Sequence, residues 1–160
     1  YLFHDTIENN IKFGCPNATH EQVVEAAGKA CCHDFISALP DGYDTVIGEG
    51  GATLSGGEKQ RISIARCLLK NAPIVIFDEA TANVDPENED QLQRAIEALT
   101  REKTVLMIAH RLKTVRNADQ ILVLDQGRIV QRGTHEELSA QEGIYQDFVS
   151  ERTAAGHWSL

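Results

Sequence analysis

Two adjacent carboxylates, Asp78 and Glu79, directly follow the apolar run Ile74-Val75-Ile76-Phe77. A continuous apolar run of this kind predicts a strand covered on both faces of a parallel sheet. Ligands of such sheets bind beyond the carboxyl ends of the strands. Mg²⁺ prefers carboxylate oxygens and retains part of its water, so the pair could hold magnesium bound to a nucleotide. A solvated acid pair at the end of a strand would show the same residues, and this motif alone leaves both alternatives open.

A second motif, Ser55-Gly56-Gly57-Glu58, predicts the start of a helix. A reciprocal cap between Ser55 and Glu58 explains those two residues completely. The two glycines need a further reason, because each costs a helix about 1 kcal/mol relative to alanine. Uncovered backbone N–H groups at a helix start can approach a phosphate closely. We therefore expect a phosphate-binding helix start, with a purely structural cap as the alternative.

A histidine, His110, comes just after the next apolar run, Thr104–Ile108. A single histidine is most often a structural residue. Its position at the end of the second strand nevertheless places it at the same sheet edge as Asp78 and Glu79. We treat it as a candidate member of that site.

The elements that must position these residues follow from periodicity and capping signals. The front of the chain predicts helices over about 19–30 and 34–39, and the helix opened by Ser55 follows. Strands are predicted over 74–77 and 104–108, separated by a helix that Asp85 caps and Pro86 begins. A hairpin over 121–130, a helix capped by Thr134 and a helix over 143–149 complete the chain. This alternation is typical of an α/β fold with parallel strands.

Composition excludes several other classes of protein. The chain has 160 residues, 42% of them hydrophobic, and a formal charge of −9. An acidic protein is a poor general binder of nucleic acid, which needs a basic surface. No apolar segment is long enough to cross a bilayer. The four cysteines form no C-x-x-C pair and are expected to be intracellular thiols, and no H-E-x-x-H zinc motif occurs.

Taken together, four motifs in this order closely resemble the nucleotide-binding domain of an ABC transporter of the exporter type. They are Leu54–Arg61, Ile74–Thr81, Ala82–Asp85 and Ala109–Arg111. The resemblance extends from about Tyr1 to Val149. It implies an α/β fold, namely a partial P-loop NTPase-like parallel sheet with a helical signature-motif subdomain. The implied parts are a helical subdomain over 1–71, part of the ATPase core over 72–151 and a loose tail over 152–160.

The resemblance assigns nucleotide-binding roles to two segments. Ser55, Gly56, Gly57 and Glu58 match the signature motif, which binds the γ-phosphate of ATP held by the opposite subunit. Asp85 matches the aspartate of the D-loop, a further nucleotide-binding position. Glu58 stands where the family usually has glutamine, but its capping role would turn the carboxylate back toward the helix.

The resemblance also assigns the chemical roles. Asp78 matches the Walker B aspartate, which positions Mg²⁺, and Glu79 matches the catalytic glutamate that polarises the attacking water. His110 matches the switch histidine, which contacts the γ-phosphate. Phosphoryl transfer requires mainly positioning and charge stabilisation, and these groups suit that task.

Three family elements are absent from the sequence. No G-x-x-x-x-G-K-[ST] phosphate loop occurs, and the Q-loop glutamine and the adenine-stacking aromatic residue are missing. We expect these elements upstream of Tyr1. ATP brings about four negative charges to a chain that is already acidic, so we expect the 160 residues alone to bind Mg-ATP poorly and not to hydrolyse it.

The favoured function is therefore the ATP-hydrolysing domain of an exporter at the cytoplasmic face of the cell membrane. Its expected partners are a second nucleotide-binding domain, identical or different, and transmembrane domains. A related ATPase of chromosome maintenance or DNA repair is the main alternative, because Leu-Ser-Gly-Gly-Glu-Lys also occurs there. The loop Gly48–Gly51, the sequence after the signature and the acidic charge count against it. An interaction module without chemistry is a third reading, disfavoured by the presence of Asp78, Glu79 and His110.

Overall fold

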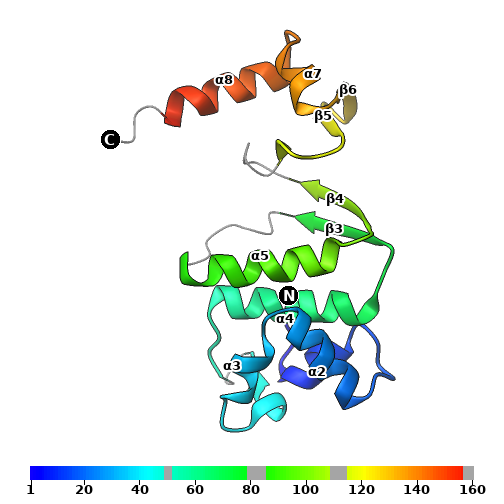
Figure 1. Cartoon of the computed structure of the whole chain (residues 1–160), viewed down its shortest axis with the longest axis vertical. Helices are drawn as coiled ribbons and strands as arrows, with labels where there is room; N and C mark the ends of the chain where they lie inside the picture. The colour runs from blue at the N-terminus through cyan, green and yellow to red at the C-terminus, as the bar shows by residue number, and fades with distance from the viewer. Residues whose placement is uncertain (49–51, 79–85, 109–114, 157–160) are drawn as a thin grey trace. The chain divides into compact units, whose positions relative to one another are not determined.

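The computed structural model describes residues 1–48, 52–78, 86–108 and 115–156 (Figure 1). The chain divides into two units, Tyr1–Met107 and Ile108–Leu160. Helices and strands occur in both, which confirms the predicted α/β class. The expected functional boundary between residues 71 and 72 stays a prediction.

Short helices form the front of the first unit: α1 (Ile7–Lys12), α2 (His20–Lys29), α3 (His33–Ser37) and the 3₁₀ turn η1 (Gly42–Asp44). The predicted capping box of α2 is present, with both reciprocal bonds between Thr19 and Gln22. The segments expected over 19–30 and 34–39 are confirmed within one or two residues at their starts and ends. The helix α1 was not predicted, and Thr6 caps it by accepting a hydrogen bond from the backbone N–H of Asn9.

A small antiparallel pair lies beside these helices. The strands are β1 (Asp5–Thr6) and β2 (Val46–Ile47), with Asp5 opposite Ile47 and Thr6 opposite Val46. The pair brings the start of the chain next to the segment that leads into α4. The strand β2 precedes the helix α4 (Gly56–Lys70) in the sequence and is therefore held by its pairing with β1.

The rest of the first unit alternates helices and strands. The strand β3 (Ile74–Asp78) follows α4, and the helix α5 (Pro86–Thr100) leads to the strand β4 (Thr104–Ile108). The strands β3 and β4 are neighbours and run in the same direction, as predicted (Figure 1). The backbone N–H of Thr104 donates to the carbonyl oxygen of Pro73 where the two strands begin. The helix α4 packs on α1, α2 and α5.

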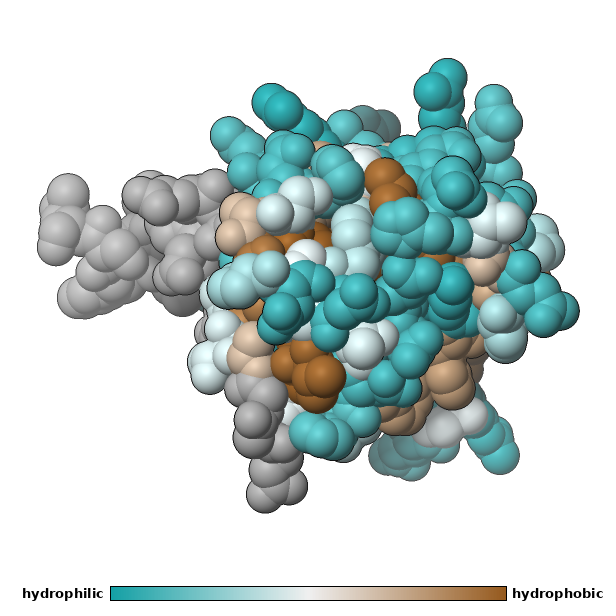
Figure 2. Space-filling model, turned by 90° about the horizontal axis from the view of Figure 1, so that it is seen from below, coloured by the Kyte–Doolittle hydropathy of each residue, from teal (hydrophilic) through white to brown (hydrophobic). Residues whose placement is uncertain are grey.

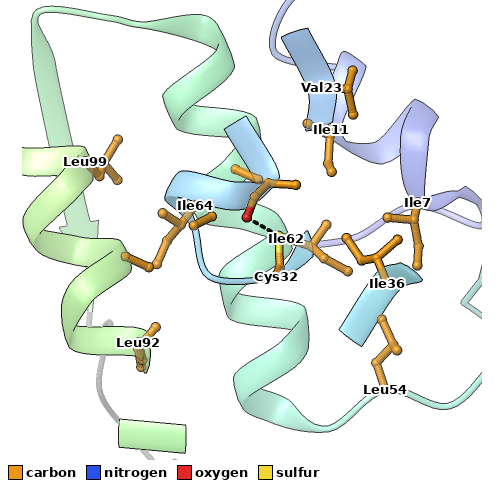
Figure 3. Close-up of a cluster of buried hydrophobic side chains, with 14 of the residues drawn as sticks. Ile7, Ile11, Val23, Cys32, Ile36, Leu54, Ile62, Ile64, Leu92 and Leu99 are labelled. Atoms are coloured by element: carbon orange, nitrogen blue, oxygen red, sulfur yellow. Dashed lines mark hydrogen bonds between the residues drawn. The ribbon is translucent and has the colours of Figure 1, made fainter. Parts of the chain in front are cut away.

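The main hydrophobic core lies around α4. Ile62 and Ile64 of this helix contact a cluster that includes Ile7 and Ile11 of α1 and Leu92 of α5 (Figure 3). The same cluster includes Val75 and Phe77 of β3. The core therefore includes residues of both α4 and β3. The apolar circumference of α4 predicts a largely buried helix, and its buried residues are Gly57, Arg61, Ile62, Ile64 and Ala65.

The prediction that both central strands are covered on both faces is wrong for this chain. In β3 only Val75 and Phe77 are buried, and Ile74 and Ile76 are 59% and 65% exposed. In β4 every residue is exposed. The sequence pattern shows that a strand is apolar, but burial also needs elements on both sides of it. In this two-stranded sheet, the described residues supply such a cover to one side of β3 only.

The second unit contains the predicted hairpin and two helices. The strands β5 (Ile121–Asp125) and β6 (Arg128–Gly133) pair antiparallel, with a register shift between Val123 and Leu124. The helices α7 (His135–Ser139) and α8 (Ile144–Gly156) follow. Thr134 and Glu137 form the predicted capping box. The last helix is longer than expected, and it includes residues 152–156 of the predicted loose tail.

The surface at the helical end of the first unit is largely hydrophilic, with apolar side chains in small separate patches (Figure 2). Scattered apolar surface of this kind is normal for a folded chain. Among the described helices, none combines the length and apolar character needed to cross a membrane.

Candidate functional site

The helix α4 begins with a reciprocal cap between Ser55 and Glu58. The backbone N–H of Ser55 donates to Oε2 of Glu58 at 2.8 Å. The backbone N–H of Glu58 donates to Oγ of Ser55 at 3.3 Å. A hydroxyl that accepts one bond keeps its own hydrogen, so Ser55 can still donate to a ligand. The Glu58 carboxylate is directed to the Ser55 backbone, as expected from its place in the capping box.

The two glycines of the motif differ in exposure. Gly56 is exposed, whereas Gly57 is buried. Neither first-turn N–H has an acceptor within the helix itself, and the helix dipole places partial positive charge there. Of the two glycines, Gly56 therefore presents the accessible surface.

A cavity of about 600 Å³ adjoins this helix start. Gly56, Lys59, Gln60 and Ser63 of α4 line one side, and residues of the segments 1–2, 47–48 and 52–54 line the rest. Lys59 adds a positive charge to the backbone donors. Lys59 was not predicted as a site residue, although its position directly after Glu58 of the signature motif is a signal for it.

The predicted metal ligand Asp78 is the last residue of β3, and its side chain is exposed. The described residues contain no cluster of three or more His, Cys, Asp or Glu side chains suited to a metal. Mg²⁺ commonly uses one or two carboxylates and completes its shell with water and substrate phosphates. A single exposed carboxylate at a strand end fits that kind of site.

The helix α4 and the strand β3 run in opposite directions, so the start of α4 and the end of β3 lie at the same end of the first unit (Figure 1). Ser55 caps the start of α4 and Asp78 ends β3, and both elements contribute to one core. Glu79, Asp85 and His110 lie outside the described residues, and their roles stay predictions.

A buried arginine, Arg61, supports α4 one turn after the capping box. It is 2% exposed, and its guanidinium lies 5.3 Å from the centre of the Phe35 ring of α3. Such cation–π contacts are strengthened when both groups are removed from water. Arg61 therefore ties the signature helix to the front helices, a role that the sequence pattern did not reveal.

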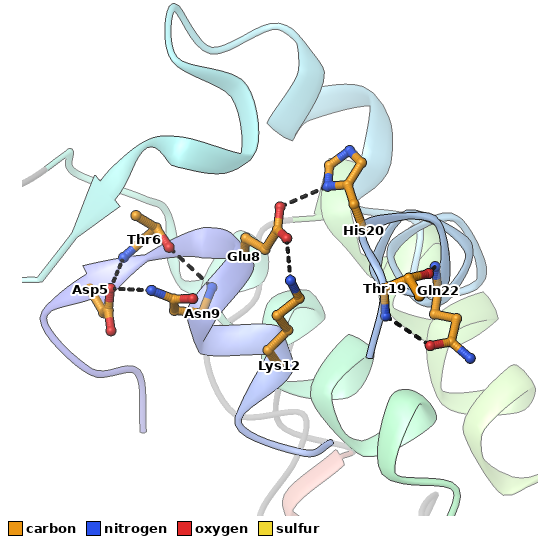
Figure 4. A network of polar contacts seen from close by, with 8 residues as sticks. All are labelled: Asp5, Thr6, Glu8, Asn9, Lys12, Thr19, His20 and Gln22. Carbon is orange, nitrogen blue, oxygen red and sulfur yellow. Dashed lines mark hydrogen bonds and ion pairs between the residues drawn. The ribbon is translucent and has the colours of Figure 1, made fainter. Parts of the chain in front are cut away.

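A polar network joins α1 to α2 on the same front (Figure 4). Glu8 contacts Nζ of Lys12 and Nδ1 of His20, each at 2.7 Å. Partial burial disfavours the charged form of Glu8, but the hydrogen bonds from Lys12 and His20 outweigh it and lower the pKa of Glu8. The network steadies the helices against which α4 packs.

Comparison with known proteins identifies the family. Residues 4–82 match the family described as ABC transporter. The chain is 58% identical over 144 residues to an ATP-dependent lipid A-core flippase of Syntrophus aciditrophicus (strain SB), covering 90% of this chain and 24% of that protein. It is 53% identical over 149 residues to a putative multidrug export ATP-binding/permease protein of Staphylococcus aureus (strain NCTC 8325 / PS 47), covering 93% and 26%.

A solved structure described as a bacterial Atm1-family ABC exporter with ATP bound has the same fold. Its TM-score is 0.82 at 46% identity, and the match covers 94% of this chain and 26% of that chain. The chain thus spans about a quarter of the length of the relatives it matches. From these matches, and from a signature-type helix start and a strand that ends in aspartate, we conclude that the chain belongs to the ABC transporter family and is part of an exporter-type nucleotide-binding domain.

Proposed function

We propose that this chain is part of the ATP-hydrolysing domain of an exporter and couples ATP hydrolysis to transport across a membrane. The observation that carries the proposal is the match, at 46% identity and a TM-score of 0.82, to a solved structure described as an ABC exporter with ATP bound. Relatives named as a flippase and as an export ATP-binding/permease protein support the exporter over the alternative ATPase of chromosome maintenance or DNA repair.

The residues present fit one part of an ATP site. The exposed Gly56 N–H, the Ser55 hydroxyl and the nearby Lys59 are donors or cations suited to a terminal phosphate. These three residues offer few contacts to the other two phosphates and no specific contact to the base. In our proposal the rest of the triphosphate is therefore held by a second nucleotide-binding domain, and the start of α4 contacts it across the interface between the two domains.

Asp78 is proposed to hold Mg²⁺ at the end of β3. Bound there with nucleotide, the ion would neutralise charge on the phosphate oxygens. Glu79 would accept a hydrogen bond from the attacking water and orient it, and His110 would donate to the terminal phosphate. Asp85 would contact the nucleotide across the same interface. In each role the side chain positions a proton or a charge near the reacting phosphate. Such positioning is the main contribution of a protein to phosphoryl transfer.

The wider assembly follows from the same proposal. Two nucleotide-binding domains, of identical or different sequence, would close on ATP, and transmembrane domains would convert this closure into transport. Such an assembly places the domain at the cytoplasmic face of the cell membrane. We further propose that the 160 residues alone bind Mg-ATP weakly and do not hydrolyse it, because the phosphate loop is not among them.

The decisive experiment uses the complete transporter that carries this chain, purified and reconstituted in lipid vesicles. We expect Glu79→Gln to abolish phosphate release while ATP binding persists, because Gln keeps the size of Glu but loses its charge. Glu142→Gln, at an exposed turn position, is the matched control and should retain full activity. Unchanged hydrolysis by Glu79→Gln would contradict the assignment of Glu79.

The same assay on the isolated 160 residues tests the second half of the proposal. We expect no ATP-dependent phosphate release above the Glu79→Gln background. Robust hydrolysis that Glu79→Gln abolishes would show that the chain holds a complete site and would overturn this part of the proposal.

A further inference from the structure

The second unit contains a polar cavity that none of the roles above uses. Its volume is about 530 Å³, within the range of about 300–1,000 Å³ that small-ligand sites occupy. Its lining residues are Arg116, Asn117, His135, Glu136, Ser139 and Ala140. Five of these six side chains can form hydrogen bonds, so the cavity suits a polar ligand.

A buried tyrosine, Tyr145, contacts the imidazole of His135. Oη of Tyr145 lies 2.9 Å from Nδ1 of His135. Tyr145 is only 5% exposed, and burial raises the pKa of its hydroxyl, which therefore keeps its hydrogen. In the tautomer whose Nδ1 accepts from this hydroxyl, the hydrogen of the neutral ring is on Nε2, which is then a donor. Tyr145 thus holds the orientation of His135, and the phosphate site uses the tautomer with the hydrogen on Nε2.

The remaining lining groups are mainly donors as well. Arg116 offers a guanidinium with five N–H groups, and Asn117 offers an amide NH₂. Ser139 adds a hydroxyl, whose Oγ lies 3.3 Å from Nδ1 of His135. Guanidinium groups match the oxygens of a phosphate in a two-point geometry, which adds specificity to charge.

One carboxylate lines this cavity and limits its positive character. Glu136 lines it and opposes the binding of an anion. The neighbouring Glu137 is engaged elsewhere, because its Oε2 accepts a hydrogen bond from the backbone N–H of Thr134 at 2.9 Å. Glu136 is exposed, and its carboxylate can remain in water while Arg116 faces a ligand.

We propose that this cavity binds a phosphate group, as inorganic phosphate or as a phosphate monoester, through Arg116, Asn117, the Nε2–H of His135 and Ser139. The ligand oxygens accept every one of these hydrogen bonds. Tyr145 acts as a positioning residue, since it orients His135 without lining the cavity. None of these residues is among those assigned to ATP, so the proposal stands or falls independently of the proposed function.

The test is a titration of the isotopically labelled 160-residue chain with inorganic phosphate, at ionic strength held constant with chloride, followed by NMR. We expect saturable shifts of the signals of Arg116, Asn117, His135 and Ser139. Arg116→Gln should weaken binding at least about tenfold, which corresponds to about 1.4 kcal/mol. Glu136→Gln should tighten binding, because it removes the opposing charge. A parallel titration with glycerol 2-phosphate shows whether a monoester is accepted as well as the free ion.

The chain offers a matched control for the histidine. His33 has a similar tyrosine contact in the first unit, with Nδ1 2.9 Å from Oη of Tyr43, although the serine four residues later contacts its Nε2. His135→Gln should reduce phosphate affinity and His33→Gln should leave it unchanged. Tyr145→Phe should reduce affinity less than His135→Gln does. Shifts that never saturate, or that are equal in wild type and Arg116→Gln while both chains remain folded, would overturn the proposal.

Discussion

Arg66 of α4 and Asn10 of α1 are joined by two hydrogen bonds across 56 positions of the sequence. Nε of Arg66 donates to the carbonyl oxygen of Asn10 at 2.7 Å, and Nη2 donates to Oδ1 at 3.1 Å. A third bond runs from Nη1 to the carbonyl oxygen of Tyr1 at 2.8 Å. The guanidinium also lies over the rings of Phe3 and Phe13. One side chain therefore fixes the start of the chain on the signature helix.

The first prediction concerns this guanidinium. Arg66→Lys keeps the charge but loses the planar fork, so it should lower the free energy of unfolding by about 1–3 kcal/mol. Urea denaturation followed by circular dichroism measures the change. Lys59→Arg on the exposed side of the same helix is the control and should change stability by less than about 0.5 kcal/mol. Equal stabilities for wild type and Arg66→Lys would contradict the importance of the fork.

The second prediction compares two glycines. A Cβ at position 14 would overlap the carbonyl oxygen of Arg66, whereas a Cβ at position 28 meets nothing within 4 Å. Gly14→Ala should therefore destabilise the fold by about 1–3 kcal/mol. Gly28→Ala in α2 should stabilise it by about 0.5–1 kcal/mol, because alanine is the better helix former. Thermal unfolding of the two variants measures both changes. Changes of the same sign in the stability of the two variants would refute the prediction.

The third prediction concerns alkaline pH. Burial raises the pKa of the Cys32 thiol to about 12, and burial raises that of the Tyr43 hydroxyl to about 12 as well. The folded state therefore favours the protonated forms, and its stability is complete below about pH 9 and decreases toward pH 12. Urea denaturation at a series of pH values measures the slope.

One variant and one reagent control that measurement. Cys32→Ala removes one of the two groups and should flatten the slope between pH 9 and 12. Iodoacetamide at pH 8.5 should modify the exposed Cys67 well before the buried Cys32. A Cys32 that reacts as fast as Cys67 in the folded chain would show that its burial is not as described.

The fourth prediction concerns the exposed side of β3. Ile76 is 65% exposed and Val75 is 8% exposed. Ile76→Thr should reduce self-association of the isolated chain in sedimentation measurements, with little loss of stability, because Thr retains strand propensity. Val75→Thr introduces a hydroxyl into the core and should destabilise the fold by about 1–3 kcal/mol. An unchanged association state for Ile76→Thr would show that this surface does not drive it.

Local patterns in the sequence predicted much of the fold. Thr19, Ser55 and Thr134 each begin a helix through a side chain three residues later, so the signal and its partner lie together in the sequence. The turn at Gln126 and Gly127 likewise lies between the two strands that it connects. Both kinds of feature depend on few residues and little on the rest of the molecule.

The features that were missed depend on contacts between distant residues. The helix α1 is six residues long and contains two asparagines and two isoleucines, which favour helix only weakly. It is stabilised by packing on α4, a contact that no local pattern reveals. The candidate site shows the same contrast between local and distant contacts. The Ser55–Glu58 cap was predictable from the sequence, whereas the burial of Gly57 follows from tertiary packing.

The caps at Thr19, Ser55 and Thr134 have a consequence for the order in which the chain acquires structure during its synthesis. Each joins residues only three positions apart, so it closes almost no loop and can form as soon as its own segment leaves the ribosome. The bonds of Arg66 to Tyr1 and Asn10 must wait until more than fifty further residues have emerged. The nascent chain should therefore present the start of the signature helix before Arg66 anchors Tyr1 and Asn10.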